Sequence, residues 1–100
     1  MKDLQSIRDA IDKIDTEILQ LISQRQRIVK SAAQFKNCIE GDSGVIVPKR
    51  INSMLISIKQ QAKELNIQED FAEKWFSDLI DYCISLELEE WDIIANNKSK

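Results

Sequence analysis

The sequence contains no histidine, and it has only two glycines, one proline and two cysteines among its 100 residues. Without histidine, it lacks the side chain that most often acts as a general base or metal ligand near neutral pH. So few glycines and prolines do not suit the many turns of an all-β or α/β domain, so we expect an all-α fold with long helices. The chain also offers no Ser-His-Asp group, no metal-ligand cluster and no glycine-rich phosphate loop, and we expect neither a metal nor a cofactor.

Other features that the sequence lacks narrow the class of protein that we expect. Cys38 and Cys83 are far apart and form no CxxC motif, so we expect reduced thiols in a cytoplasmic protein. The opening MKDLQSIRD lacks the apolar core of a secretory signal, and no apolar run approaches the about 18 residues of a membrane span. The net charge is −3, without a basic block, which argues against a nucleic-acid partner. With 43% hydrophobic and 31% charged residues, the chain is typical of one small globular domain.

Apolar residues in the first third of the chain recur at helical spacing. One row has a period of seven residues, and a second row lies four residues further on. These rows are Ile7, Ile14, Leu21, Ile28 and Phe35, and Ile11, Ile18 and Ala32. They predict an amphipathic helix from an N-cap at Asp3 to about residue 37. Because so small a domain cannot bury so long a stripe by itself, we expect an extended partner helix from a second copy.

The next segments predict two further helices. Residues 40–44, EGDSG, are typical of a loop, and Pro48 is a favourable first residue for a second helix. That helix would end at a short turn over residues 65–68.

A third helix is predicted from about Glu69 to Ile94, with both tryptophans and Tyr82 in the core. The chain then divides into a helical domain of residues 1–95 and a polar tail of residues 96–100, which we expect to be disordered.

One charge falls inside the apolar stripe of the first helix. Arg25 lies seven residues after Ile18 and seven before Ala32, so it points inward. Lys36 follows eleven residues later, which on a helix is within about 20° of the same direction and roughly 16 Å along the axis. A buried, unpaired guanidinium is costly, so an anion must meet Arg25. The pattern alone leaves open a salt bridge in a dimer core and a site for a small polyanion.

Glu87 is a matching anomaly in the third helix, because apolar residues flank it at helical spacing on both sides. One interpretation is that it neutralises Arg25 or Lys36. The other is that its carboxyl has a raised pKa and donates a hydrogen bond to a ligand. Arg50 in the second helix is a further candidate for the same groove, and an exposed Arg50 is the alternative.

Three segments together resemble a known family. IRDAIDKIDTEILQLISQRQRIVKSAAQFK is similar to the first helix of the all-helical, type II chorismate mutases. PKRINSML and LIDYCISLELEEW resemble the branch that contains the isochorismate pyruvate lyases. The likeness extends from about Leu4 to Trp91. It implies three-helix protomers in an intertwined homodimer, with two identical sites that each bind a dianionic dicarboxylate, chorismate or isochorismate.

The resemblance also implies roles for individual cations. Arg8, by its place in IRDAID, would enter the site of the partner protomer, Arg25 would grip a carboxylate, and Lys36 would lie near the ether oxygen of the enolpyruvyl bridge. The chemistry is pericyclic and needs no nucleophile. The protein holds a flexible dianion in its compact conformer and stabilises the charge that develops on the ether oxygen.

The sequence departs from the chorismate mutase pattern at three positions. The acidic pair that holds the ring hydroxyl of chorismate falls on Val45 and Lys49, neither of which is acidic. The glutamine that faces the ether oxygen is Glu87, which must be protonated there or have another role. The length of the loop after the first helix resembles that of the mutases more than that of the lyases.

The predicted site therefore combines catalytic and binding residues. The resemblance makes Arg25, Lys36 and Glu87 the catalytic set. The substrate-binding set consists of Arg8, Lys49 and Arg50, with apolar walls inferred from stripe position at Val29, Met54 and Ile84.

Three functions stay open. We favour elimination of pyruvate from isochorismate, which gives salicylate, over rearrangement of chorismate to prephenate. A third hypothesis is a non-catalytic helical dimer that binds or regulates a partner, which the missing acidic pair supports.

Overall fold

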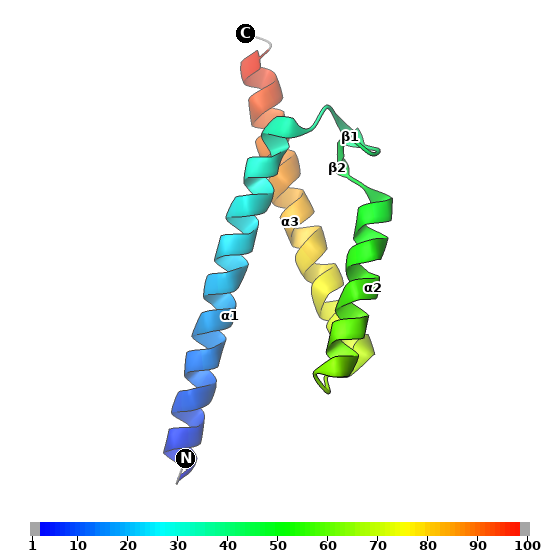
Figure 1. Cartoon of the computed structure of the whole chain (residues 1–100). Helices are drawn as coiled ribbons and strands as arrows, with labels where there is room; N and C mark the ends of the chain where they lie inside the picture. The colour runs from blue at the N-terminus through cyan, green and yellow to red at the C-terminus, as the bar shows by residue number, and fades with distance from the viewer. Residues whose placement is uncertain (1–2, 99–100) are drawn as a thin grey trace.

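Three helices dominate the computed structural model, which describes residues 3–98 (Figure 1). Within this range, a short 3-10 turn and two three-residue strands separate the first helix from the second. The elements are α1 (Leu4–Ala32), η1 (Ala33–Phe35), β1 (Cys38–Glu40), β2 (Gly44–Ile46), α2 (Pro48–Glu64) and α3 (Glu69–Lys98). The predicted three-helix fold is confirmed, and the small strand pair is an addition to it.

The first helix begins as predicted but ends early. The side chain of Asp3 accepts a hydrogen bond of 2.7 Å from the backbone N–H of Ser6, which caps the helix. The expected end near residue 37 is wrong, because α1 stops at Ala32 and tightens into η1. The reason is tertiary: the N–H of Asn37 bonds the carbonyl of Ser43, and the indole of Trp91 bonds the carbonyl of Lys36. These contacts replace a further helical turn.

The segment between α1 and α2 is more ordered than the predicted loop at residues 40–44. Strands β1 and β2 pair in parallel, and Cys38 lies opposite Gly44. Gly41 adopts a φ of 126°, a conformation that side chains rarely tolerate. A Cβ on Gly44 would lie 2.9 Å from the backbone of both Ile39 and Glu40. Both glycines of the chain are thus needed in this one connection.

Helices α2 and α3 form an antiparallel pair joined by a short turn (Figure 1). The start of α2 at Pro48 and the turn before Glu69 are confirmed. The disordered tail is wrong for residues 96–98, because α3 continues to Lys98. No glycine or proline follows Ile94 to stop the helix. Residues 99 and 100 of the expected tail lie outside the described residues.

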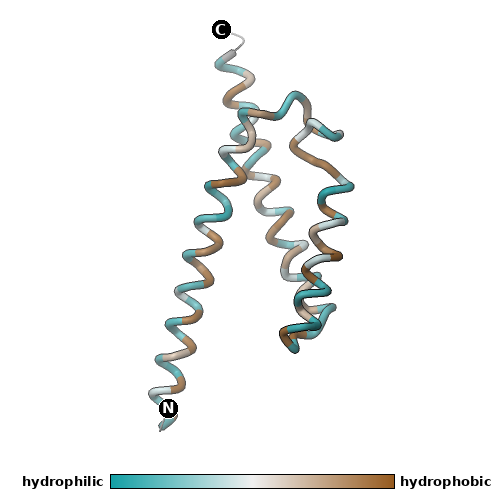
Figure 2. The backbone as a smooth tube through the Cα atoms, viewed as in Figure 1, coloured by the Kyte–Doolittle hydropathy of each residue, from teal (hydrophilic) through white to brown (hydrophobic). Residues whose placement is uncertain are grey.

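The molecule is long and thin, with extents of 62 × 27 × 15 Å. Its radius of gyration is 17.4 Å, whereas a compact chain of this length would have about 13 Å. The N-terminal half of α1 stands away from α2 and α3 (Figure 1), and hydrophobic residues recur along it (Figure 2). No residue of α1 is buried, and its exposed apolar side chains include Ile7, Ile11, Ile14, Ile18, Leu21 and Ile28. A single chain therefore leaves the predicted stripe in water.

The core is small and centres on α3. Its buried hydrophobic residues are Ala33, Val45, Ala62, Ala72, Ile80 and Cys83. The prediction that both tryptophans and Tyr82 lie in the core is wrong for Trp75, which is 37% exposed, and for Tyr82, which is 49% exposed. Phe35 is also exposed, because it lies in η1 and not on the stripe of α1. In the described part of the chain, no helix is long and apolar enough to cross a bilayer.

Candidate functional site

A cavity of about 630 Å³ lies between α1, β2, α2 and α3. It is lined by the C-terminal half of α1, the first turns of α2 and the middle turns of α3. Seven of the nine predicted site residues line it, namely Arg25, Val29, Lys36, Arg50, Met54, Ile84 and Glu87. Segments between Leu21 and Glu87 thus meet at one site.

Arg25 enters this cavity from α1. Its Nη1 atom is buried and has no hydrogen-bond partner among the described residues. Within residues 3–98 no carboxyl pairs with this atom, so the predicted salt bridge in a dimer core would need a carboxyl from a second copy. Because an unpaired buried guanidinium is costly, the arrangement favours an anion that arrives from outside.

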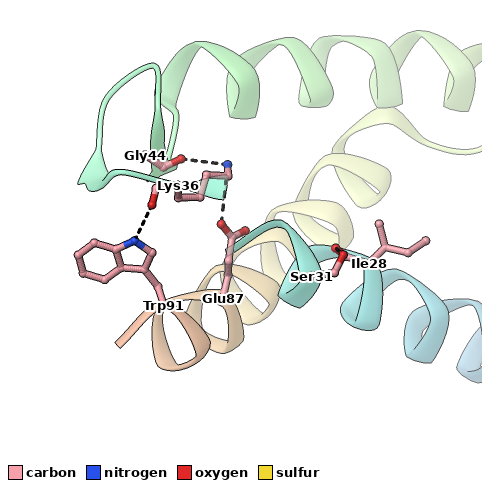
Figure 3. A network of polar contacts seen from close by, with 6 residues as sticks. All are labelled: Ile28, Ser31, Lys36, Gly44, Glu87 and Trp91. Carbon is pink, nitrogen blue, oxygen red and sulfur yellow. Dashed lines mark hydrogen bonds and ion pairs between the residues drawn. The ribbon is translucent and has the colours of Figure 1, made fainter. Parts of the chain in front are cut away.

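Lys36 enters the same cavity after the end of α1. Its backbone is extended, with φ −96° and ψ 137°. The Nζ atom donates a hydrogen bond of 3.0 Å to the carbonyl of Gly44 and lies 3.7 Å from Oε2 of Glu87, an ion pair (Figure 3). The predicted shared groove of Arg25 and Lys36 exists, but a continuous helix does not create it.

Glu87 is the buried acidic residue of the site, with 5% of its surface exposed. Its Oε2 atom has no hydrogen-bond partner within residues 3–98. Burial raises the pKa of this carboxyl above its ordinary value, and the nearby charge of Lys36 offsets only part of that rise. Glu87 is thus a carboxyl in this cavity whose pKa is raised by burial, and it lies beside the ammonium of Lys36.

Arg50 lies at the rim of the cavity and adds a third cation. The cavity is thus lined by three cationic side chains, those of Arg25, Lys36 and Arg50, and by one carboxyl, that of Glu87. Apolar side chains, including Val29, form most of the remaining walls. An excess of cationic side chains in an apolar pocket suits a small anion with more than one negative charge.

Two predicted residues lie outside this cavity. Lys49 is exposed and, unlike Arg50, its neighbour on α2, does not line the cavity. Arg8 is exposed near the start of α1, about 25 Å along the helix from Arg25. Within a single chain, Arg8 cannot reach the cavity.

The sequence analysis missed a role for three residues around Lys36. Val45 was noted for lacking a charge, but it is buried and forms part of the wall. Gly44 supplies the carbonyl that holds Nζ, and Trp91 bonds the Lys36 carbonyl from α3. The spacing of Trp91 and Glu87, four residues on one helix, was the available signal, since it places both on the same face.

Residues 3–98 contain no group of three or more histidine, cysteine or acidic side chains placed to hold a metal ion.

Comparisons with known proteins match this chain to one protein family. The chorismate mutase type II family model matches residues 7–88. Isochorismate pyruvate lyase from Pseudomonas aeruginosa is 32% identical over 88 residues, which cover 88% of this chain and 84% of that protein. Chorismate mutase from Methanocaldococcus jannaschii is 31% identical over 99 residues, which cover 97% and 96%. The bifunctional chorismate mutase/prephenate dehydratase from Aquifex aeolicus is 28% identical over 90 residues, 24% of its length.

Proposed function

This chain belongs to the chorismate mutase type II family, and we propose that within this family it eliminates pyruvate from isochorismate to give salicylate. The proposal rests on the charges that line the cavity: three cationic side chains and one carboxyl, that of Glu87. A dianion suits this excess of positive charge, whereas a ligand that needs more than one acidic partner does not.

The missing second carboxyl supports isochorismate over chorismate. In the mutases that the sequence resembles, an acidic pair holds the ring hydroxyl. Here the corresponding positions are Val45, which is buried and apolar, and Lys49, which does not line the cavity. In this proposal Glu87, beside Lys36, faces the ether oxygen and not that hydroxyl. A hydroxyl left without its partner in an apolar site would weaken binding of chorismate.

In this reaction the protein needs only to position the substrate and to stabilise the charge that develops on it. The ether C–O bond of isochorismate breaks while a ring hydrogen moves to the methylene carbon of the enolpyruvyl group. Pyruvate leaves, and the ring becomes aromatic. In this proposal Arg25 holds a carboxylate by a bidentate contact, and the compact conformer is selected on binding. Lys36 stabilises the negative charge that develops on the ether oxygen.

Glu87 fits this mechanism in its protonated form. An ionised carboxylate would repel the developing oxyanion, whereas a carboxylic acid can donate a hydrogen bond to it. The raised pKa of Glu87, caused by burial, supports the protonated form.

We infer that two copies complete the site. The apolar stripe of α1 is exposed along the first half of the helix, and no residue of α1 is buried. A second α1 packed along it would remove that surface from water and stabilise the assembly. The same arrangement would carry Arg8 of the second copy toward the cavity, which it cannot reach in its own chain. Light scattering combined with gel filtration tests this expectation, which requires a mass near twice that of the chain.

Rearrangement of chorismate to prephenate is the second candidate. The specific observation in its favour is that the Methanocaldococcus jannaschii chorismate mutase matches almost end to end, over 96% of its own length.

Parallel incubation with isochorismate and chorismate, followed by product analysis, tests the proposal. Salicylate and pyruvate in equal amounts from isochorismate, formed faster than prephenate from chorismate, are the expected result. Prephenate as the main product would assign the mutase reaction instead. If neither substrate is consumed at high protein concentration, the chain is a non-catalytic member of the family.

A further inference from the structure

Lys36 is held at three points, although it lies outside regular helix (Figure 3). Its ammonium contacts the carbonyl of Gly44 at 3.0 Å and the carboxyl of Glu87 at 3.7 Å. Its own backbone carbonyl accepts a hydrogen bond of 3.1 Å from the indole N–H of Trp91. The third contact acts on the backbone and not on the charge.

The contact with Trp91 joins segments that are distant in the sequence. The two residues are 55 positions apart, one at the end of η1 and the other in the second half of α3. Trp91 follows Glu87 by four residues, so both lie on one face of α3. One helical face thus presents a carboxyl to the side chain of Lys36 and a donor to its carbonyl.

This contact matters because the helix no longer determines where Lys36 lies. After Ala32 the chain leaves the α-helical ladder, and the backbone of Lys36 is extended. A bond to its carbonyl therefore fixes the point from which the side chain starts. Loss of the donor would leave a partly buried carbonyl unsatisfied and free the junction to shift.

We propose that Trp91 is a positioning residue for Lys36. The indole sets the backbone of Lys36, so that its ammonium stays directed into the cavity between Gly44 and Glu87. The proposal deepens the proposed function and rests on it for the role of Lys36 in the reaction. Trp91 lies beyond residue 88, where the match to the family model ends, so that match gives it no role.

The substitution Trp91→Phe tests this directly, because it keeps an aromatic ring and removes the N–H donor. We expect kcat to fall about tenfold, since a small displacement of a group that acts on the transition state is costly. We expect KM to change less than about twofold, since Arg25 and not Lys36 holds the carboxylate in the ground state.

Tyr82→Phe is the matched control. Tyr82 also lies on α3, and its hydroxyl donates a hydrogen bond of 2.9 Å to Gln26 on α1. This substitution removes an aromatic donor between α3 and α1, the helix that precedes Lys36, without touching Lys36. We expect its kcat to equal that of the unchanged protein. An equal loss in both variants would overturn the proposal, because it would reflect general packing of α3 against α1.

A second measurement does not depend on turnover. The N–H groups of Asn37, Gly41 and Gly44 make backbone hydrogen bonds within the β1–β2 connection. If Trp91 fixes the residue before this connection, hydrogen exchange at residues 37–44 should be faster in Trp91→Phe and unchanged in Tyr82→Phe.

Kinetics and hydrogen exchange together distinguish failure of the positioning proposal from failure of the proposed function. If the unchanged protein converts neither substrate, the proposed function fails, and faster exchange confined to Trp91→Phe still supports positioning of Lys36. If the protein is active and Trp91→Phe retains full kcat, the positioning proposal is overturned while the proposed function stands. Unchanged exchange in an inactive protein overturns both.

Discussion

Arg25 and Lys36 line the same cavity, but different kinds of structure hold them. Arg25 lies within α1, where the ladder of backbone hydrogen bonds determines the direction of each side chain. Lys36 lies four residues beyond the end of that helix and depends on Gly44, Glu87 and Trp91. The Arg25 end of the site is thus set locally, and the Lys36 end is set by contacts between distant segments.

The two ends also differ in the partners that their cationic side chains already have. At the Arg25 end, a buried Nη1 atom has no partner in the described part of the chain. At the Lys36 end, the ammonium already has a carbonyl and a carboxyl nearby. In the proposed function a ligand would give Nη1 of Arg25 its first partner, whereas at Lys36 it would compete with Gly44 and Glu87.

The largest expected effect is at Arg25. We expect Arg25→Ala to lower kcat/KM about a thousandfold, because a carboxylate of the substrate loses its charged partner. The proposed dimer and the melting temperature should persist, since Nη1 of Arg25 has no hydrogen-bond partner within residues 3–98 to lose. Arg27→Ala, an exposed neighbour on the same helix, is the control. A large loss of dimer stability with activity retained would instead assign Arg25 to a salt bridge in the interface.

The next effect is at Lys36. We expect Lys36→Met to lower kcat about a hundredfold, because the charge on the ether oxygen loses its stabilising cation. The pKa of Glu87 should rise further, since the attraction of Lys36 now lowers it. Steady-state kinetics and carboxyl titration by nuclear magnetic resonance measure the two changes. Lys30→Met, at an exposed position of α1, should alter neither.

The pH dependence reports on Glu87. Because burial raises the pKa of this carboxyl, the protonated form persists to higher pH than in an ordinary glutamate. If that form donates to the ether oxygen, kcat should fall by up to about tenfold for each pH unit above this pKa. Glu87→Gln should remove the fall and give higher activity than the unchanged protein at neutral pH. An identical pH profile in both proteins would contradict the donor role.

The same shift has a defined sign for stability. A carboxyl whose pKa is raised on folding favours the folded state while it is protonated, below its unfolded pKa. That contribution is lost as the pH rises through the higher, folded pKa. Glu87→Gln should therefore be more stable than the unchanged protein above this range, as thermal unfolding at several pH values would measure.

The smallest expected effect is at Gly44. A methyl group there would lie 2.9 Å from backbone atoms of Ile39 and Glu40, so the connection must move. We expect Gly44→Ala to lower the free energy of unfolding by about 1–3 kcal/mol and kcat by a few fold, because the carbonyl that holds Lys36 shifts. Ser43→Ala, at an exposed neighbouring position, is the control for both measurements. Full stability in Gly44→Ala would show that the connection adapts without cost.

Local patterns were sufficient for the helices. The period of apolar residues predicted α1, and Pro48 marked the start of α2. The inward directions of Arg25 and Glu87 followed from the same periodicity, and both residues line the cavity. Each of these features depends on residues within a few turns of one another, which the sequence displays directly.

Predictions that depended on distant contacts fared differently. The predicted end of α1, at about residue 37, is later than its observed end at Ala32, because Trp91 and Ser43 bond the backbone there from elsewhere in the fold. Lys36 was assigned to the correct groove by extending a helix that does not continue. Lys49 and Arg50 looked alike as neighbours, but only the latter lines the cavity.

The sequence by itself thus determined three helices, an inward arginine and an inward glutamate, because helical periodicity is a local property. Only the tertiary structure decided how Lys36 reaches the cavity, which of two adjacent cations on α2 lines it, and that Trp91 bonds the backbone of Lys36. Those features depend on contacts across as many as 55 residues, whose geometry arises when α3 packs against the end of α1. Spacing along the chain does not encode such contacts residue by residue, since they depend on where several elements end.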